Sequence, residues 1–160
     1  MTIQEPRIQD FMTLQPLAIE GKENIETARK MMSKFSIRHL PVLTDGIVSG
    51  ILSERELNLA TGIECVDPLR LLVIDACSER PYIVHPNTPL REVVDVMAKE
   101  HFGSAIVMEN THLVGIFTTV DACRALHELI EEAIEESNRE NTRNFRFFLK
   151  SILRVHGKDV

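Results

Sequence analysis

The 160-residue chain lacks several features that mark particular classes of protein. Its cysteines, Cys65, Cys77 and Cys123, are odd in number and have no zinc-site spacing, so neither a disulfide framework nor a structural metal is expected. No apolar run approaches the roughly 18 residues of a membrane span, and the first residues show no signal-peptide pattern. We therefore expect a cytoplasmic protein with no membrane span.

Positive charge is also in deficit, with 18 Lys and Arg against 24 Asp and Glu and a net charge of −6. Such a chain gains no general attraction to phosphate backbones, so no nucleic-acid partner is expected. The catalytic patterns HExxH, CxxC, HxE, GxxxxGK[ST], GxGxxG and GxSxG are all missing. Because no nucleophile has a matching base, the sequence predicts no enzyme, no catalytic metal and no required cofactor.

What the chain does contain is an internal repeat at an offset of 65 residues (121 − 56), which aligns Glu56 with Asp121. The alignment needs no gap between Asp10 and Ala60, and apolar positions stay in phase throughout. Identical pairs are Asp10/Asp75, Pro16/Pro81, Met32/Met97, Lys34/Lys99, Val42/Val107, Gly50/Gly115, Ile51/Ile116 and Ala60/Ala125. The chain is a tandem duplication.

Each repeat reads as strand, helix, strand, strand, helix, which predicts an α+β fold. The expected strands are 16–19, 39–43 and 48–52 in the first repeat and 81–84, 105–108 and 113–117 in the second. Amphipathic helices begin near Asn24 and Pro89, where a polar cap or a proline at the first helical position is favoured. Second helices begin near Glu54 and Thr119.

Two stretches carry a resemblance to a known family. Residues 37–43 (IRHLPVL) followed by 48–56 (VSGILSERE), and 103–108 (GSAIVM) followed by 113–121 (LVGIFTTVD), are similar to the signature of CBS domains. The resemblance implies a tandem CBS pair, or Bateman module, with pseudo-two-fold symmetry and two clefts between the units. It further implies a homodimer and a regulatory role. We expect CBS domain 1 at 8–64, CBS domain 2 at 73–130 and a helical extension at 131–160.

Family clefts bind AMP, ADP, ATP or S-adenosylmethionine, so the resemblance implies an adenine nucleotide as regulatory ligand. An aspartate would hold the ribose hydroxyls, while hydroxyl groups and a helix N-terminus would approach the phosphates. The residues carried over to the first cleft are Thr13, Leu17, Ile37, Arg38, His39, Thr118 and Asp121. Two alternatives stay open: His39 as a packed strand histidine, and Arg38 as the partner of surface carboxylates.

The second cleft would contain Ser53, Glu56, Ser78, Tyr82, Phe102 and Ser104. Glu56 is longer than the usual aspartate, and no cation stands in the register of Arg38 and His39, so we expect this cleft to be empty or to hold a weaker ligand. Ser or Thr followed three residues later by Glu or Asp is also the capping box of a helix. That reading is favoured for Ser53 and Glu56, and the ligand reading for Thr118 and Asp121.

The C-terminal extension is expected to contain two helices, one running on from Asp121 through 136 and another from Asn141 or Thr142 to His156, with Gly157 as its cap. Apolar residues Phe145, Phe148, Leu149, Ile152 and Val155 lie at helical spacing, opposite Arg143, Arg146, Lys150 and Arg154. Such a helix can bind a membrane or a partner, or pack within its own dimer and pair with the acidic run 128–136. We favour the second interpretation.

Two functions follow from this pattern. The favoured one is a ligand-sensing module that binds an adenine nucleotide between the CBS units and transmits a conformational change to an unknown partner protein. The alternative is a ligand-free dimeric interaction module that acts through its C-terminal amphipathic helix.

Overall fold

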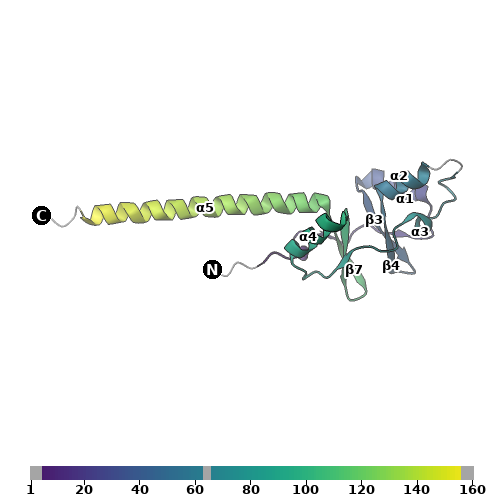
Figure 1. The fold of residues 1–160 in the computed structure, drawn as a ribbon, viewed down its shortest axis with the longest axis horizontal. Coiled ribbons are helices and arrows are strands. Elements are labelled where there is room, and N and C mark those ends of the chain that lie inside the picture. The colour runs from purple at the N-terminus through teal and green to yellow at the C-terminus, as the bar shows by residue number, and fades with distance from the viewer. Residues whose placement is uncertain (1–4, 63–65, 156–160) are drawn as a thin grey trace. The chain divides into compact units, whose positions relative to one another are not determined.

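The computed structural model describes residues 5–62 and 66–155, and side-chain surroundings as far as residue 146 (Figure 1). Residues up to Ala122 form one compact unit, and a second unit begins at Cys123. The expected end of the first domain at residue 64, and the helix end at His156 with its cap at Gly157, lie outside the described residues.

The first repeat contains β2 (Ile19–Glu20), α1 (Ile25–Phe35), β3 (His39–Thr44), β4 (Ile47–Ser53) and α2 (Glu54–Thr61). β2 runs parallel to β3, and β3 runs antiparallel to β4. The β3–β4 turn places Asp45 and Gly46 at φ 51° and 79°, as two-residue hairpin loops prefer. Asn24 is the N-cap of α1, and its side chain accepts the Thr27 N–H at 2.8 Å.

The second repeat has the same order, with β5 (Ile83–Val84), α4 (Leu90–Glu100), β6 (Ser104–Glu109), β7 (His112–Thr118) and then α5 (Thr119–Val155). The α+β order predicted from the sequence is therefore confirmed in both repeats, although the opening strands are shorter than expected. Pro89 is the N-cap residue of α4 and not its first helical residue.

Short segments cross from each repeat to the other, which the sequence did not predict. β1 (Thr13–Leu14) pairs with β7 through Thr13 and Ile116, and Ser78 bridges Ile51 in β4 at the position 65 residues away. β1 is thus an edge of the four-stranded sheet β1-β7-β6-β5, while β2-β3-β4 form the other sheet. Backbone hydrogen bonds follow the same two-fold relation between the repeats. The Ile8 N–H donates to the Thr88 carbonyl at 2.9 Å, and the equivalent Val73 N–H donates to the Glu23 carbonyl at 2.8 Å.

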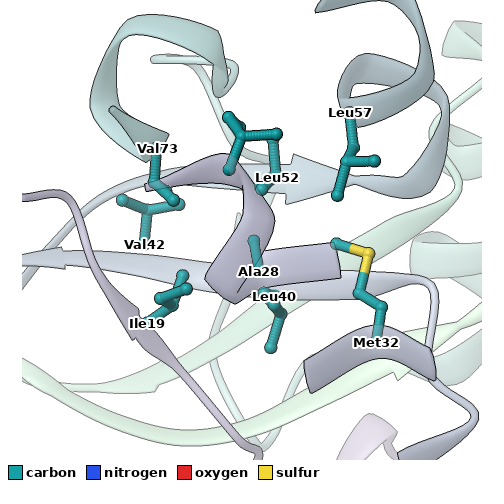
Figure 2. Close-up of a cluster of buried hydrophobic side chains, with 9 residues drawn as sticks. Ile19, Ala28, Met32, Leu40, Val42, Leu52, Leu57 and Val73 are labelled. Atoms are coloured by element: carbon teal, nitrogen blue, oxygen red, sulfur yellow. The ribbon is translucent and has the colours of Figure 1, made fainter. Parts of the chain in front are cut away.

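The hydrophobic core of the first repeat shows why these crossings matter (Figure 2). Helix α1 contributes Ile25, Ala28 and Met32, and the strands and α2 contribute Ile19, Leu40, Val42, Leu52 and Leu57. Val73 completes the cluster from α3 (Val73–Ala76), which opens the second repeat. Its counterpart Ile8, in the 3-10 helix η1 (Ile8–Asp10), is also fully buried. Each repeat therefore completes its core with the entry segment of the other.

α5 is one continuous helix of 37 residues, so the expected break before Asn141 is wrong (Figure 1). Residues 137–140 contain neither proline nor glycine, and Arg139 pairs with Glu135 at 2.8 Å along the helix. The Thr142 hydroxyl also donates to the Asn138 carbonyl at 2.9 Å. Nothing in this segment terminates a helix, although its polar composition resembles a linker.

Candidate functional site

A cavity of about 530 Å³ lies between the two repeats, within the first compact unit. It contains all six residues predicted for the second cleft: Ser53, Glu56, Ser78, Tyr82, Phe102 and Ser104. The hydrogen bonds between Ile51 and Ser78, at 3.0 and 2.9 Å, hold one wall against the end of β4. The cavity thus combines the start of α2 with the segment that enters the second repeat.

The start of α2 has the geometry of a capping box. The Ser53 N–H donates to Glu56 Oε2 at 2.7 Å, and the Glu56 N–H donates to Ser53 Oγ at 3.3 Å. The capping interpretation therefore describes Ser53 and Glu56 correctly. The other carboxylate oxygen, Oε1, has no hydrogen bond to any residue that the structure describes, so Glu56, which lines the cavity, keeps an unused acceptor.

Thr118 and Asp121 repeat this arrangement at the start of α5. Asp121 Oδ2 accepts from the Thr118 N–H at 2.9 Å and from its hydroxyl at 2.7 Å. The carboxylate is buried, with only 4% of the residue exposed. The structure therefore shows a capping role for this pair, and its predicted ribose contact stays a prediction.

Two aromatic rings form the apolar wall of the cavity. Tyr82 and Phe102 stack with ring centroids 5.5 Å apart and an interplanar angle of 22°. Burial, followed by the charge of Glu92, raises the pKa of the Tyr82 phenol above its usual value, so it stays a protonated donor. The equivalent first-cleft positions are Leu17 and Ile37, so this aromatic pair has aliphatic counterparts in the other repeat.

Three arginines, Arg38, Arg55 and Arg80, line the same cavity. None of them forms an ion pair with any residue in the described part of the chain, which leaves three guanidinium groups available to an anion. We expected no cation here because Gly103 and Ser104 occupy the register of Arg38 and His39. The structure differs because Arg55 and Arg80 come from other positions and Arg38 lines this cleft from the segment just before β3.

His39 also lines this cavity and lies directly beside Gly103, where an added Cβ would be 2.7 Å from its Nε2 atom. Burial, reinforced by the charge of Arg38, lowers the pKa of His39, while Glu56 and Glu54 oppose the shift weakly. The histidine is therefore neutral near pH 7 and can donate or accept one hydrogen bond in the cavity.

The residues predicted for the first cleft have the following places in the structure. Arg38 and His39 line the cavity of the second cleft, and Ile37 and Arg38 border a smaller hollow of about 320 Å³ beside α1. Thr13 lies in β1, opposite Ile116, and Leu17 is 41% exposed. The sequence reasoning missed Arg55 and Arg80, although Arg80 stands only two residues before Tyr82.

The described residues also bear on metal binding and on membrane insertion. Among residues 5–62 and 66–155, no group of three His, Cys, Asp or Glu side chains is arranged to hold a metal ion. None of the described helices is long and apolar enough to cross a membrane.

Comparison with known proteins gives the same family by sequence and by structure. The family model described as CBS domain matches residues 8–60 and 73–128. The CBS domain-containing protein YhcV of Bacillus subtilis is 25% identical over 114 residues, which cover 71% of this chain and 81% of that protein. The crystal structure of AcuB from Vibrio cholerae aligns with a TM-score of 0.75 and 25% identity, covering 82% of this chain and 98% of that one.

Two similar solved structures contain adenosyl ligands. The CBS domain pair of protein MJ0100, in complex with 5′-methylthioadenosine and S-adenosyl-L-methionine, has a TM-score of 0.71 and 20% identity over 78% of this chain and 98% of that one. CBSX2 in complex with AMP has a TM-score of 0.68 and 21% identity over 76% and 97%. At these identities the likeness shows the shared fold.

Proposed function

Because the chain belongs to the CBS domain family and contains two copies of the domain in tandem, we propose that it is a regulatory module that binds an adenosine phosphate. The observation that carries the proposal is the cavity of about 530 Å³ with an aromatic wall and three arginines that form no ion pair with any described residue. The module acts on a partner and not on a substrate.

Each part of the cavity suits one part of the ligand. The stacked Tyr82 and Phe102 rings offer an apolar surface to an adenine base. Glu56 Oε1 accepts a ribose hydroxyl, since a carboxylate is a good acceptor for sugar hydroxyl groups. Arg38, Arg55 and Arg80 surround the phosphates, where planar guanidinium groups bind oxygen pairs.

We expected the phosphorylated ligand in the Asp121 cleft from the sequence. We now place it in the cleft of Glu56, because the three arginines lie there. The Asp121 cleft stays the proposed site for a second adenosyl ligand. S-adenosyl-L-methionine and 5′-methylthioadenosine, bound by MJ0100, carry no phosphate and are the appropriate probes for it. The signal is a population shift, since a ligand that contacts both repeats favours the arrangement to which it binds more tightly.

A thermal-shift series tests the proposal. Adenosine, AMP, ADP, ATP, S-adenosylmethionine and 5′-methylthioadenosine are each added to the full chain. A ligand at 100 times its Kd adds about 2.7 kcal/mol to the free energy of unfolding, which raises the Tm by roughly 5–10 °C. We expect the phosphorylated ligands to raise the Tm more than adenosine does.

Arg80→Ala should weaken AMP, ADP or ATP binding by about 10-fold or more, because it removes a charge-assisted hydrogen bond. The matched control is Arg91→Ala, which removes an exposed arginine paired with Glu5 outside the cavity. Asp121→Ala should leave the phosphorylated ligands bound and weaken only a ligand of the other cleft. Equal losses in Arg80→Ala and Arg91→Ala, or no Tm shift with any ligand, would contradict the proposal.

A further inference from the structure

The helix α5 exposes a row of large apolar side chains after Ala122, where the first compact unit ends. Leu126, Ile130, Ile134 and Phe145 are 60%, 48%, 51% and 60% exposed. Together with Cys123, Ser137 and Asn141 they follow spacings of 3, 4, 4, 3, 4 and 4 residues. This 11-residue period keeps the row straight along a helix and is a coiled-coil pattern. Exposed apolar rows of this kind mark interaction surfaces.

Charge changes sign along the same helix. Residues 128–136 contain five glutamates and neither lysine nor arginine, whereas residues 139–146 contain three arginines and one glutamate. Arg139 is already bonded to Glu135 within the helix, but Arg143 and Arg146 form no ion pair with a described residue. The helix therefore carries a negative segment followed by a positive one.

We propose that the apolar row is the interface of an antiparallel two-helix coiled coil with α5 of a second copy of this chain. A two-fold axis between residues 137 and 138 pairs positions whose numbers add up to 275. Ile130 then lies level with Phe145, and Glu132 with Arg143, so that the acidic segment of each helix meets the basic segment of the other. The polar positions Ser137 and Asn141 gather at the centre, and the interface is isologous.

A parallel pairing of the two helices is unfavourable because of the same charged residues. It would align the five glutamates of one helix with those of the other, at an interaxial distance of about 8–10 Å, which is close to the screening length of about 8 Å at physiological salt. The acidic segment likewise repels anionic lipid surfaces, although the apolar row alone would suit a membrane. Charge complementarity therefore selects a second copy in the antiparallel orientation.

Cysteine cross-linking of the full-length chain tests orientation and register. In a Cys123→Ser background, Ile130→Cys and Phe145→Cys are introduced separately and together. In the antiparallel coil the two copies of residue 130 are about 22 Å apart, since 15 residues of helix separate its level from that of residue 145. Under a glutathione redox buffer we expect the double variant to form a disulfide-linked dimer joining 130 to 145, and neither single variant to do so. Cross-linking of either single variant to itself would indicate a parallel coil and overturn the proposal.

Charge reversal provides an independent readout. Arg143→Glu should reduce the cross-linking yield of the double variant several-fold at low salt, and adding Glu132→Arg should restore it, because the two positions face each other across the axis. The matched control is Arg91→Glu, outside α5, which should change nothing. Absence of a cross-link in the double variant would refute the proposal. A monomer in sedimentation equilibrium at every protein concentration over a 100-fold range would refute it as well. Binding of the helix to anionic vesicles with no self-association would refute it as well.

Discussion

Gly50 and Gly115 occupy equivalent positions in the two repeats but have different neighbours. A Cβ atom added at Gly50 would lie 2.6 Å from the Ser78 carbonyl oxygen and 2.8 Å from Cys77 Sγ. The same atom at Gly115 would meet only the side chain of Met12. Backbone held by hydrogen bonds cannot move aside cheaply, whereas a methionine side chain can adopt another rotamer.

We therefore predict that Gly50→Ala is much more destabilising than Gly115→Ala. The Ser78 backbone exchanges two hydrogen bonds with Ile51, at 3.0 and 2.9 Å, so moving it weakens both. Overpacking of this kind costs about 1–3 kcal/mol. We expect a loss of about 2–3 kcal/mol for Gly50→Ala, which is a fall in Tm of roughly 5–10 °C, and less than about 1 kcal/mol for Gly115→Ala.

Urea and thermal denaturation followed by circular dichroism measure both variants. Ser78 also lines the cavity, so Gly50→Ala should weaken the ligand that occupies it, while Gly115→Ala should not. Equal destabilisation by the two variants would refute the reasoning, because it would mean that the rigidity of the Ser78 segment has no effect. A neutral Gly50→Ala would refute it as well.

Three smaller effects follow from individual side chains. Asn24→Ala should cost about 1 kcal/mol in urea denaturation because it removes the cap of α1, and Asn24→Ser should recover most of that loss. Asp121→Ala should cost about 1–2 kcal/mol without ligand, since it removes the acceptor of the Thr118 N–H and hydroxyl; each ligand shift is therefore measured against the variant's own Tm. His39 contributes a pH dependence: its pKa is lowered in the folded state, so the free energy of unfolding holds above about pH 6.5 and falls as the pH drops through the lower folded value. His39→Gln should flatten that slope, and an unchanged slope would assign it to other groups.

The sequence predicted the parts of the fold that repeat. The offset of 65 residues aligned the helices and hairpins of both units because their apolar periods and turns are local properties. β1 and the Ile51–Ser78 bridge went unpredicted since two residues are too few to carry an alternating pattern, and their pairing depends on the partner strand. The C-terminal helix was divided wrongly because residues 137–140 are polar, and polarity alone does not end a helix without glycine or proline.

The candidate site was predicted less well for a related reason. The internal repeat relates each residue only to the one 65 positions away, so Ser53, Glu56 and Tyr82 could be predicted from their equivalents. Arg80 has Gln15 at its equivalent position and Arg55 has Val120, so neither had a counterpart to indicate it. The chemistry that distinguishes the two clefts lies where the duplication has diverged.

The pairing of Thr13 with Ile116 also sets a time scale for folding during synthesis on the ribosome. These partners are separated by 103 residues (116 − 13), so the edge strand β1 has no partner strand until the ribosome has added the 103 residues that lead to Ile116. At about 5–20 residues per second, the N-terminal segment waits roughly 5–20 seconds for its partner. During that interval η1 and β1 have no sheet to join, so the first repeat emerges with an apolar entry segment that a nascent-chain chaperone can bind.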